Sequence, residues 1–181
     1  MRSRLILQLQ AHRTHTQLES AHLRRMLELA TNPGAFARDH FAPGHFTASA
    51  FVLSPTGDAL LLILHRKLGL WLQPGGHVEA TDSDLESAAR REVDEEVGLS
   101  ALECVVPTIF DVDIHRIPAH GREPAHEHFD VRFLFRSAGL ALRHTGEVQA
   151  AQWVPLAEVA RVQSDQSVLR AVDKLRRSAS G

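Results

Sequence analysis

The stretch from Leu85 to Val97 constrains the fold of this chain most, because its apolar residues recur at helical spacing between two helix-boundary signals. At about 100° per residue, one face collects the apolar side chains Leu85, Ala88, Ala89, Val93 and Val97. Ser83 and Glu86 fit a capping box before this face, and Gly98 stands where a left-handed C-terminal cap is expected. The sequence therefore predicts one short helix with a buried face and defined ends.

Three glutamates accompany this apolar face. Glu92 and Glu96 fall near its middle and Glu95 flanks it, although a carboxylate taken out of water is costly unless a positive charge meets it. Carboxylates at positions i, i+3 and i+4 emerge side by side and suit a hard cation, Mg²⁺ or Mn²⁺ rather than Zn²⁺. Mg²⁺ usually shares its coordination with substrate phosphates, so a phosphoanhydride is the expected substrate. Arg91 is placed to orient the carboxylates by a bidentate hydrogen bond.

The rest of the chain supplies helices before this stretch and strands on both sides of it. Residues 5–30 predict one or two helices, with Thr16 and Glu19 as a capping box. Period-2 or continuous apolar patterns predict strands at 47–53, 59–65, 108–117, 129–136 and 148–154, and residues 167–177 predict a closing amphipathic helix. This order of elements predicts an α/β fold, a mixed sheet covered by helices on both sides.

Size and composition fit a single globular domain with an appendage. The chain has 181 residues, 44% hydrophobic and 23% charged, and no run near the roughly 18 apolar residues that a membrane helix needs. We expect a cytoplasmic protein with no membrane partner. A net charge of -2 argues against a surface that binds nucleic acid throughout. Cys104 is the only cysteine, which excludes an internal disulfide, and we expect it to be a small buried residue.

The segment GHVEATDSDLESAARREVDEEVGL, residues 76–99, resembles the signature box of the Nudix hydrolases. That box is a glycine, five residues, a glutamate, seven residues and then R-E-U-x-E-E-x-G-U, with U aliphatic. The second half is matched in full by Arg91, Glu92, Val93, Glu95, Glu96, Gly98 and Leu99. The first half has one residue too many, so the family's first glutamate falls on Asp82 or Ser83, depending on the end from which it is counted. The resemblance extends over roughly residues 45–160.

The resemblance implies a site and a chemistry. Glu92, Glu95 and Glu96 would hold the metal, Glu92 or a loop residue would be the general base, and Arg91 would orient them. Family members often take an extra carboxylate from downstream, and the candidates for it are Glu127 and Glu147. Just before the helix, the glycine loop would bring backbone near phosphates, so the expected substrate-binding residues are Gly75, Gly76 and His77.

The family's chemistry gives a first hypothesis and an alternative. The first is a Nudix pyrophosphohydrolase, dependent on Mg²⁺ or Mn²⁺, that cleaves the pyrophosphate bond of a nucleoside diphosphate linked to another group. Its substrate would be a soluble small molecule: a nucleotide sugar, a dinucleotide or a nucleoside triphosphate. The alternative is a non-catalytic nucleotide-sensing module. Such modules commonly lose carboxylates of the box. This box keeps all three.

We expect a Nudix-type α/β/α sandwich over residues 45–181, preceded by a helical extension over residues 1–44. The extension would form a dimer surface, a lid or a cap on the sheet, so a homodimer is a candidate assembly. It contains no DNA-reading motif, and no specific DNA binding is expected.

One strand carries a polar pattern with two interpretations. Strand parity places His126, His128, Asp130 and Arg132 on one face and leaves Glu127 with the phenylalanines. The polar set is either a ligand set or simply the polar face of a strand. His45, His65 and His77 have no spacing that singles them out.

Overall fold

The computed structural model describes residues 1–66, 68–143, 146 and 148–178. These residues form two compact units. Unit 1 comprises Met1–Ser49, Gly75–Ala89 and Val106–Phe133, and unit 2 comprises Ala50–Pro74, Arg90–Val105 and Leu134–Gly181. Two strands and one helix begin in unit 1 and continue into unit 2.

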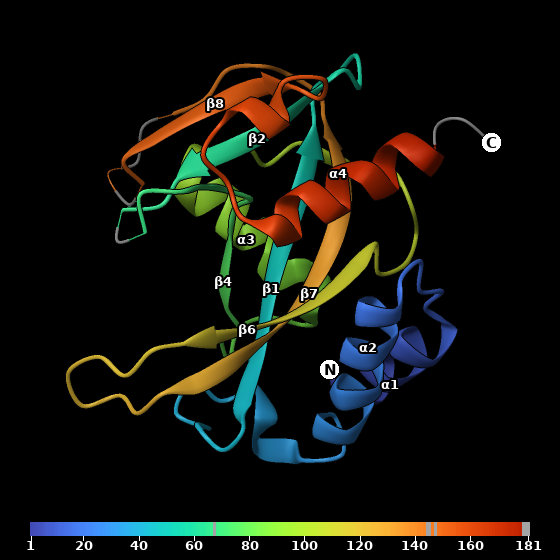
Figure 1. The fold of residues 1–181 in the computed structure, drawn as a ribbon, viewed down its shortest axis with the longest axis vertical. Helices are drawn as coiled ribbons and strands as arrows, with labels where there is room; N and C mark the ends of the chain where they lie inside the picture. The colour runs from blue at the N-terminus through green and yellow to red at the C-terminus, as the bar shows by residue number, and fades with distance from the viewer. Residues whose placement is uncertain (67, 144–145, 147, 179–181) are drawn as a thin grey trace. The chain divides into compact units, whose positions relative to one another are not determined.

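Two helices open unit 1, as the sequence predicts. They are α1 (Arg2–Ala11) and α2 (Gln17–Leu29), which lie side by side (Figure 1). Thr16 caps α2, because its Oγ1 accepts a hydrogen bond from the Glu19 amide at 3.1 Å. The predicted return bond differs: the Glu19 carboxylate accepts from the amide of His15 at 2.7 Å and lies 2.8 Å from the His12 ring. Glu19 therefore anchors the segment between the two helices to α2.

Among the described residues, eight strands share one hydrogen-bonded sheet, ordered β3-β2-β1-β7-β5, with β4 on β1, β6 on β7 and β8 on β2. Their bounds are β1 Gly44–Leu53, β2 Ala59–Leu64, β3 Trp71–Leu72, β4 Gly75–His77, β5 Leu102–Cys104, β6 Asp111–Ile117, β7 His126–Ser137 and β8 Ala150–Pro155. A short 3-10 helix, η1 (Pro33–Phe36), precedes β1. The α/β class predicted from the sequence is confirmed.

In unit 1, two strand pairings position the polar side chains discussed below. β4 pairs antiparallel with β1, with Thr47 opposite His77 and Ser49 opposite Gly75. β6 and β7 form a long antiparallel hairpin (Figure 1), in which His115 is opposite His128. Because β-strand side chains alternate between faces, these registers decide which polar residues meet.

Unit 2 contains the remaining strand pairs and the closing helix. β2 pairs with β8 from Ala59–Pro155 to Leu64–Ala150, and also with β3, while β5 pairs with β7. A 3-10 turn, η2 (Val159–Arg161), leads to α4 (Gln166–Ser178). Asp165 caps α4 by accepting a bond from the Val168 amide at 2.8 Å.

Helix α3 spans Leu85–Val97, the bounds predicted from its apolar spacing. Its apolar face is buried, and Gly98 adopts the expected left-handed conformation with φ 71°. The capping residue is Asp84 rather than Ser83, which corrects the predicted box. Asp84 Oδ1 accepts from the Ser87 amide at 2.8 Å and Ser87 Oγ accepts from the Asp84 amide at 3.1 Å. Asp84 also pairs with Arg4 of α1, which the Ser83 hydroxyl could not do as an ion pair.

Three residues on the polar face of β7 are buried, His126, Asp130 and Arg132, whereas His128 is half-buried. Arg132 is 1% exposed and donates to Asp130 at 2.8 Å and to Asp111 and Asp113 at 3.3 Å each. Burial alone lowers the pKa of Arg132, but the charges of these carboxylates outweigh burial and raise it above its ordinary value. Asp130 also accepts from the Thr47 and Ser49 hydroxyls of β1 at 3.1 and 2.7 Å. A buried ionic ladder thus holds β6, β7 and β1 together in unit 1.

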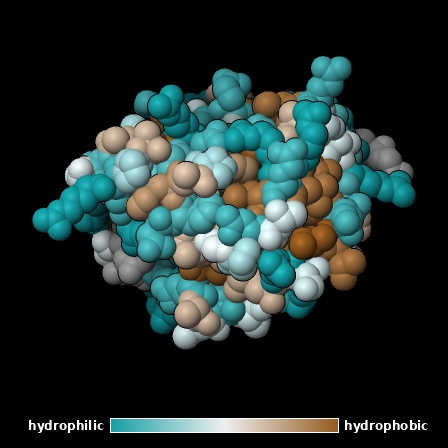
Figure 2. Space-filling view, turned by 90° about the horizontal axis from the view of Figure 1, so that it is seen from below, coloured by the Kyte–Doolittle hydropathy of each residue, from teal (hydrophilic) through white to brown (hydrophobic). Residues whose placement is uncertain are grey.

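The surface agrees with the composition. On the face drawn in Figure 2, hydrophilic side chains surround smaller apolar areas. In the described part of the chain, no helix combines the length and the apolar character needed to cross a membrane. Cys104 is exposed, so the prediction of a buried cysteine is wrong. It lies at the end of β5, where Arg90 Nη2 is 3.0 Å from its sulfur.

Candidate functional site

The carboxylates of the box lie on the C-terminal half of α3, in unit 2. Arg91 Nη1 donates to Glu92 Oε1 at 3.0 Å and to Glu95 Oε2 at 2.7 Å. A single nitrogen therefore bridges two carboxylates, where the sequence had suggested a two-pronged bond. This bridge fixes two of the three glutamate side chains on neighbouring positions of the helix.

The three glutamate side chains differ in how exposed they are to solvent. The side chain of Glu92 is 15% exposed and that of Glu95 43%, and Glu96 is half-buried. Asp94 projects to solvent and pairs with Arg143 at 3.4 Å. The three carboxylates and the Arg91 guanidinium together carry a net charge of about -2, and the ligand atoms that the carboxylates offer are all oxygens. This donor set fits a hard divalent cation such as Mg²⁺ or Mn²⁺.

The predicted substrate loop, Gly75–Gly76–His77, is strand β4 of unit 1. A Cβ on Gly75 would lie 2.3 Å from the Ser49 Cβ and 2.8 Å from the Ala48 carbonyl oxygen. Only glycine lets β4 approach β1 this closely. The following loop closes on itself, because Asp82 Oδ2 accepts from the Glu79 amide at 2.8 Å. Asp82 thus organises the loop in which the box carries its additional residue.

The two additional metal candidates have different outcomes. Glu147 lies outside the described residues. Glu127 accepts from Arg25 of α2 with both carboxylate oxygens, one of them at 3.2 Å from Nη1. Arg25 also lies over the Phe129 ring, 5.3 Å from its centroid. Any metal bound by Glu127 would have to compete with this ion pair.

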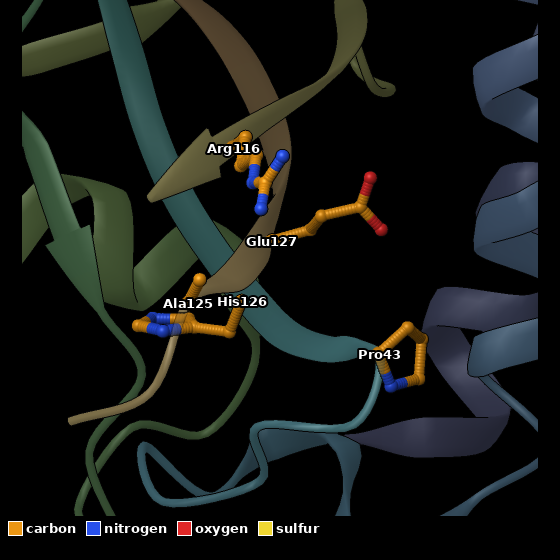
Figure 3. A pocket seen from close by; sticks show the side chains of 5 residues that line it. All are labelled: Pro43, Arg116, Ala125, His126 and Glu127. Atoms are coloured by element: carbon orange, nitrogen blue, oxygen red, sulfur yellow. The ribbon is translucent and has the colours of Figure 1, made fainter. Parts of the chain in front are cut away.

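Figure 3 shows the directions of two side chains at the start of β7. Glu127 and His126 project to opposite sides of the strand, as parity predicts. Around them lies a pocket of about 270 Å³, lined by Pro43, Arg116, Ala125, His126 and Glu127.

Unit 1 brings together histidines that the sequence left unconnected. His45 of β1, His77 of β4 and His128 of β7 each offer a ring nitrogen within 4.8 Å of the other two. Their ring centroids are 4.9–5.1 Å apart, and the His126 ring lies 5.1 Å from that of His45. Strand parity pointed to His128, but no spacing pointed to His45 or His77, since each lies on a different strand.

The pKa values of His45, His77 and His128 all lie below the usual value for histidine. Burial lowers the pKa of His45 below its usual value, more than the hydrogen bond to the His40 carbonyl raises it. Burial, together with the positive charge of neighbouring histidines, lowers the pKa of His77 to about 4 and that of His128 to about 2. Neutral imidazole is the form that binds metals.

Residues 43–173 match the family model for the NUDIX domain. The chain belongs to the Nudix family. The resemblance of residues 76–99 to the Nudix box, the Nudix α/β fold and the assignment as a Nudix pyrophosphohydrolase are therefore confirmed. No curated protein matches the sequence significantly.

Solved Nudix structures share this fold. A NUDIX-family hydrolase from Clostridium perfringens is 25% identical, with a TM-score of 0.54 over 72% of this chain and 97% of its own. An Ap4A hydrolase from C. elegans is 18% identical, with a TM-score of 0.53 over 75% and 98%. The NUDIX domain of Shewanella oneidensis NrtR, solved with ADP ribose, is 20% identical, with a TM-score of 0.53 over 82% and 93%. The last two likenesses establish the fold alone.

Proposed function

We propose that this Nudix protein is a divalent-metal-dependent hydrolase that cleaves the pyrophosphate bond of a nucleoside diphosphate linked to another group. The observation that carries the proposal is the Arg91 bridge between Glu92 and Glu95 on the box helix. It holds oxygen donors ready for a hard cation. The complete second half of the box supports catalysis over the sensing alternative.

Glu92, Glu95 and Glu96 hold the cation in this proposal, and Arg91 positions the first two. A bound Mg²⁺ or Mn²⁺ supplies charge neutralisation of the pyrophosphate and a bound water of lowered pKa. Glu92 is the candidate general base, because it is the least exposed carboxylate held by Arg91. Glu127 is better suited to tethering β7 to α2 than to binding the metal, since Arg25 engages both of its oxygens.

The substrate proposal is a soluble nucleotide: a dinucleotide, a nucleotide sugar or a nucleoside triphosphate. Two structures of the same fold support this proposal: one is named an Ap4A hydrolase and the other is a domain solved with ADP ribose. Ap4A and ADP ribose both contain a nucleoside phosphate linked to another group. Gly75, Gly76 and His77 are the proposed substrate contacts. Residues 1–44 are proposed as a helical extension, which the start of the family match at residue 43 supports.

The test is phosphate release, coupled to a phosphatase, across nucleoside triphosphates, nucleotide sugars and dinucleotides with Mg²⁺ or Mn²⁺. Glu96→Gln should lower turnover by about a hundredfold or more, because it removes a carboxylate from the cation. Asp94→Asn is the matched control: it removes the same charge from the same helix, but from a side chain that faces solvent and pairs with Arg143.

Turnover that requires metal, collapses in Glu96→Gln and survives in Asp94→Asn would support the hydrolase and name its substrate class. Binding of a nucleotide without turnover of any substrate in the panel would support the sensing module instead.

A further inference from the structure

We propose that His45, His77 and His128 form a second metal site, of the kind that binds Zn²⁺, in unit 1. The three ligand atoms come from three adjacent strands and lie within 4.8 Å of one another. The inference does not depend on the proposed hydrolase activity, because it rests on imidazole nitrogens and not on the box carboxylates; His77 is the one residue that also appears among the proposed substrate contacts.

His45 carries the argument, since it is buried and one of its nitrogens has no hydrogen-bond partner in the described part of the chain. The residue is 1% exposed. Its Nδ1 lies 3.3 Å from the His40 carbonyl oxygen, which can only accept, so Nδ1 bears the proton of the neutral ring. The remaining lone pair is on Nε2, and among the described residues no group donates to it. A buried acceptor without a donor is unfavourable, and a cation beside Nε2 would remove that cost.

The bond from Nδ1 to the His40 carbonyl is also the outer-shell contact typical of a histidine ligand. Metal-binding histidines usually donate their second ring nitrogen to a carbonyl or carboxylate, which fixes the ring's orientation and tautomer. His45 shows this arrangement before any ion is considered.

The spacing of the three rings is close to what an ion needs. Four ligands around Zn²⁺ at its usual nitrogen distance lie about 3.3 Å from one another, so modest ring rotation would bring nitrogens within 4.8 Å onto a common ion. The strand registers hold these rings in place: His77 is opposite Thr47, two residues from His45. Three histidine ligands leave a fourth position for water, as in three-histidine zinc sites.

Donor type separates this site from the carboxylates of α3. Imidazole nitrogen suits Zn²⁺, Cu²⁺ and Ni²⁺, whereas carboxylate oxygen suits Mg²⁺ and Mn²⁺. The histidine site should therefore bind Zn²⁺ in the presence of a large excess of Mg²⁺.

The experiment uses the full-length protein, stripped of metal with a chelator and titrated with Zn²⁺ against a chromophoric competitor in excess Mg²⁺. We expect one Zn²⁺ per chain. His128→Gln should weaken its binding by more than about a hundredfold, because loss of a mere outer-shell partner already costs 10- to 100-fold. The matched control, His120→Gln, changes an exposed histidine on the β6–β7 loop and should leave the affinity unchanged. Zinc binding that is unaffected in a folded His128→Gln protein, or lost only in Glu96→Gln, would overturn the proposal.

A second measurement needs no substitution and so does not depend on a variant that folds. Co²⁺ added to the metal-free wild-type protein should give the intense visible absorption of four-coordinate cobalt, and Zn²⁺ should displace it. If the spectrum showed only the weak bands of six-coordinate, oxygen-bound cobalt, the histidine site would be refuted. Because neither readout measures hydrolysis, failure of this proposal is distinguishable from failure of the proposed function.

Discussion

Replacing Arg132 with methionine should lower the free energy of unfolding by about 3–5 kcal/mol, the cost of breaking a buried ion pair by removing one partner. Arg132 is 1% exposed and lies 2.8–3.3 Å from three carboxylates, which are 1–7% exposed themselves. Methionine fills much of the volume but supplies no charge. The local buried charge would change from about -2 to -3, and three carboxylates would lose a donor.

The magnitude is bounded from both sides. The Thr47 and Ser49 hydroxyls still donate to Asp130 in the variant, so part of the charge stays solvated by the protein, which argues against a larger loss. Asp111 and Asp113 lie 3.3 Å from Arg132 with side chains only 1% and 7% exposed, so water cannot easily replace the lost donor, which argues against a small loss.

Urea unfolding followed by circular dichroism measures this change. Arg136→Met is the matched control, because Arg136 lies on the same strand but is exposed, and its loss should stay within about 0.5 kcal/mol. Asp113→Asn should cost less in the Arg132→Met background than in the wild type, with a coupling of about 1–3 kcal/mol. Equal losses for Arg132→Met and Arg136→Met would refute the view that this ladder stabilises unit 1.

Three further predictions concern β4, α2 and the histidines. Gly75→Ala should cost about 1–3 kcal/mol by overpacking β4 against β1; Gly139→Ala meets nothing within 4 Å, and equal urea midpoints for the two would contradict this. Arg25→Gln should cost about 0.5–1 kcal/mol, because its ion pair with β7 is partly exposed, whereas exposed Arg24→Gln should cost nothing measurable in thermal unfolding. In metal-free protein, burial lowers the pKa of His77 from 6.5 to about 4. Below pH 6.5 the unfolded state therefore binds more protons than the folded state. The contribution of neutral His77 to the free energy of unfolding is complete above pH 6.5 and is lost as the pH falls toward 4. Urea titrations at pH 7 and 5 should therefore show a smaller acid loss in His77→Gln, and identical losses would argue against it.

Local sequence predicted the box helix, the other α-helices and the five longer strands, because their signals lie within a few residues of one another; it did not predict the short strands β3, β4 and β5. The spacing of Leu85, Val93 and Val97 gave the bounds of α3, and Gly98 its end. The box glutamates were found for the same reason: one helical turn brings Glu92, Glu95 and Glu96 together. Where neighbouring residues compete for one role, local patterns were less reliable. Asp84 caps α3 instead of Ser83, since it also pairs with Arg4 of a distant helix.

Only the tertiary structure decided which residues far apart in sequence share an environment. Parity placed His128 and Arg132 on one face of a strand, but the register of three strands brought His45 and His77 to His128 and buried Arg132 among aspartates. The same packing paired Glu127 with Arg25, an assignment that no local pattern contains. The physical reason is that helix and strand periodicity act over a few residues, whereas strand pairing depends on the free energy of the whole folded chain.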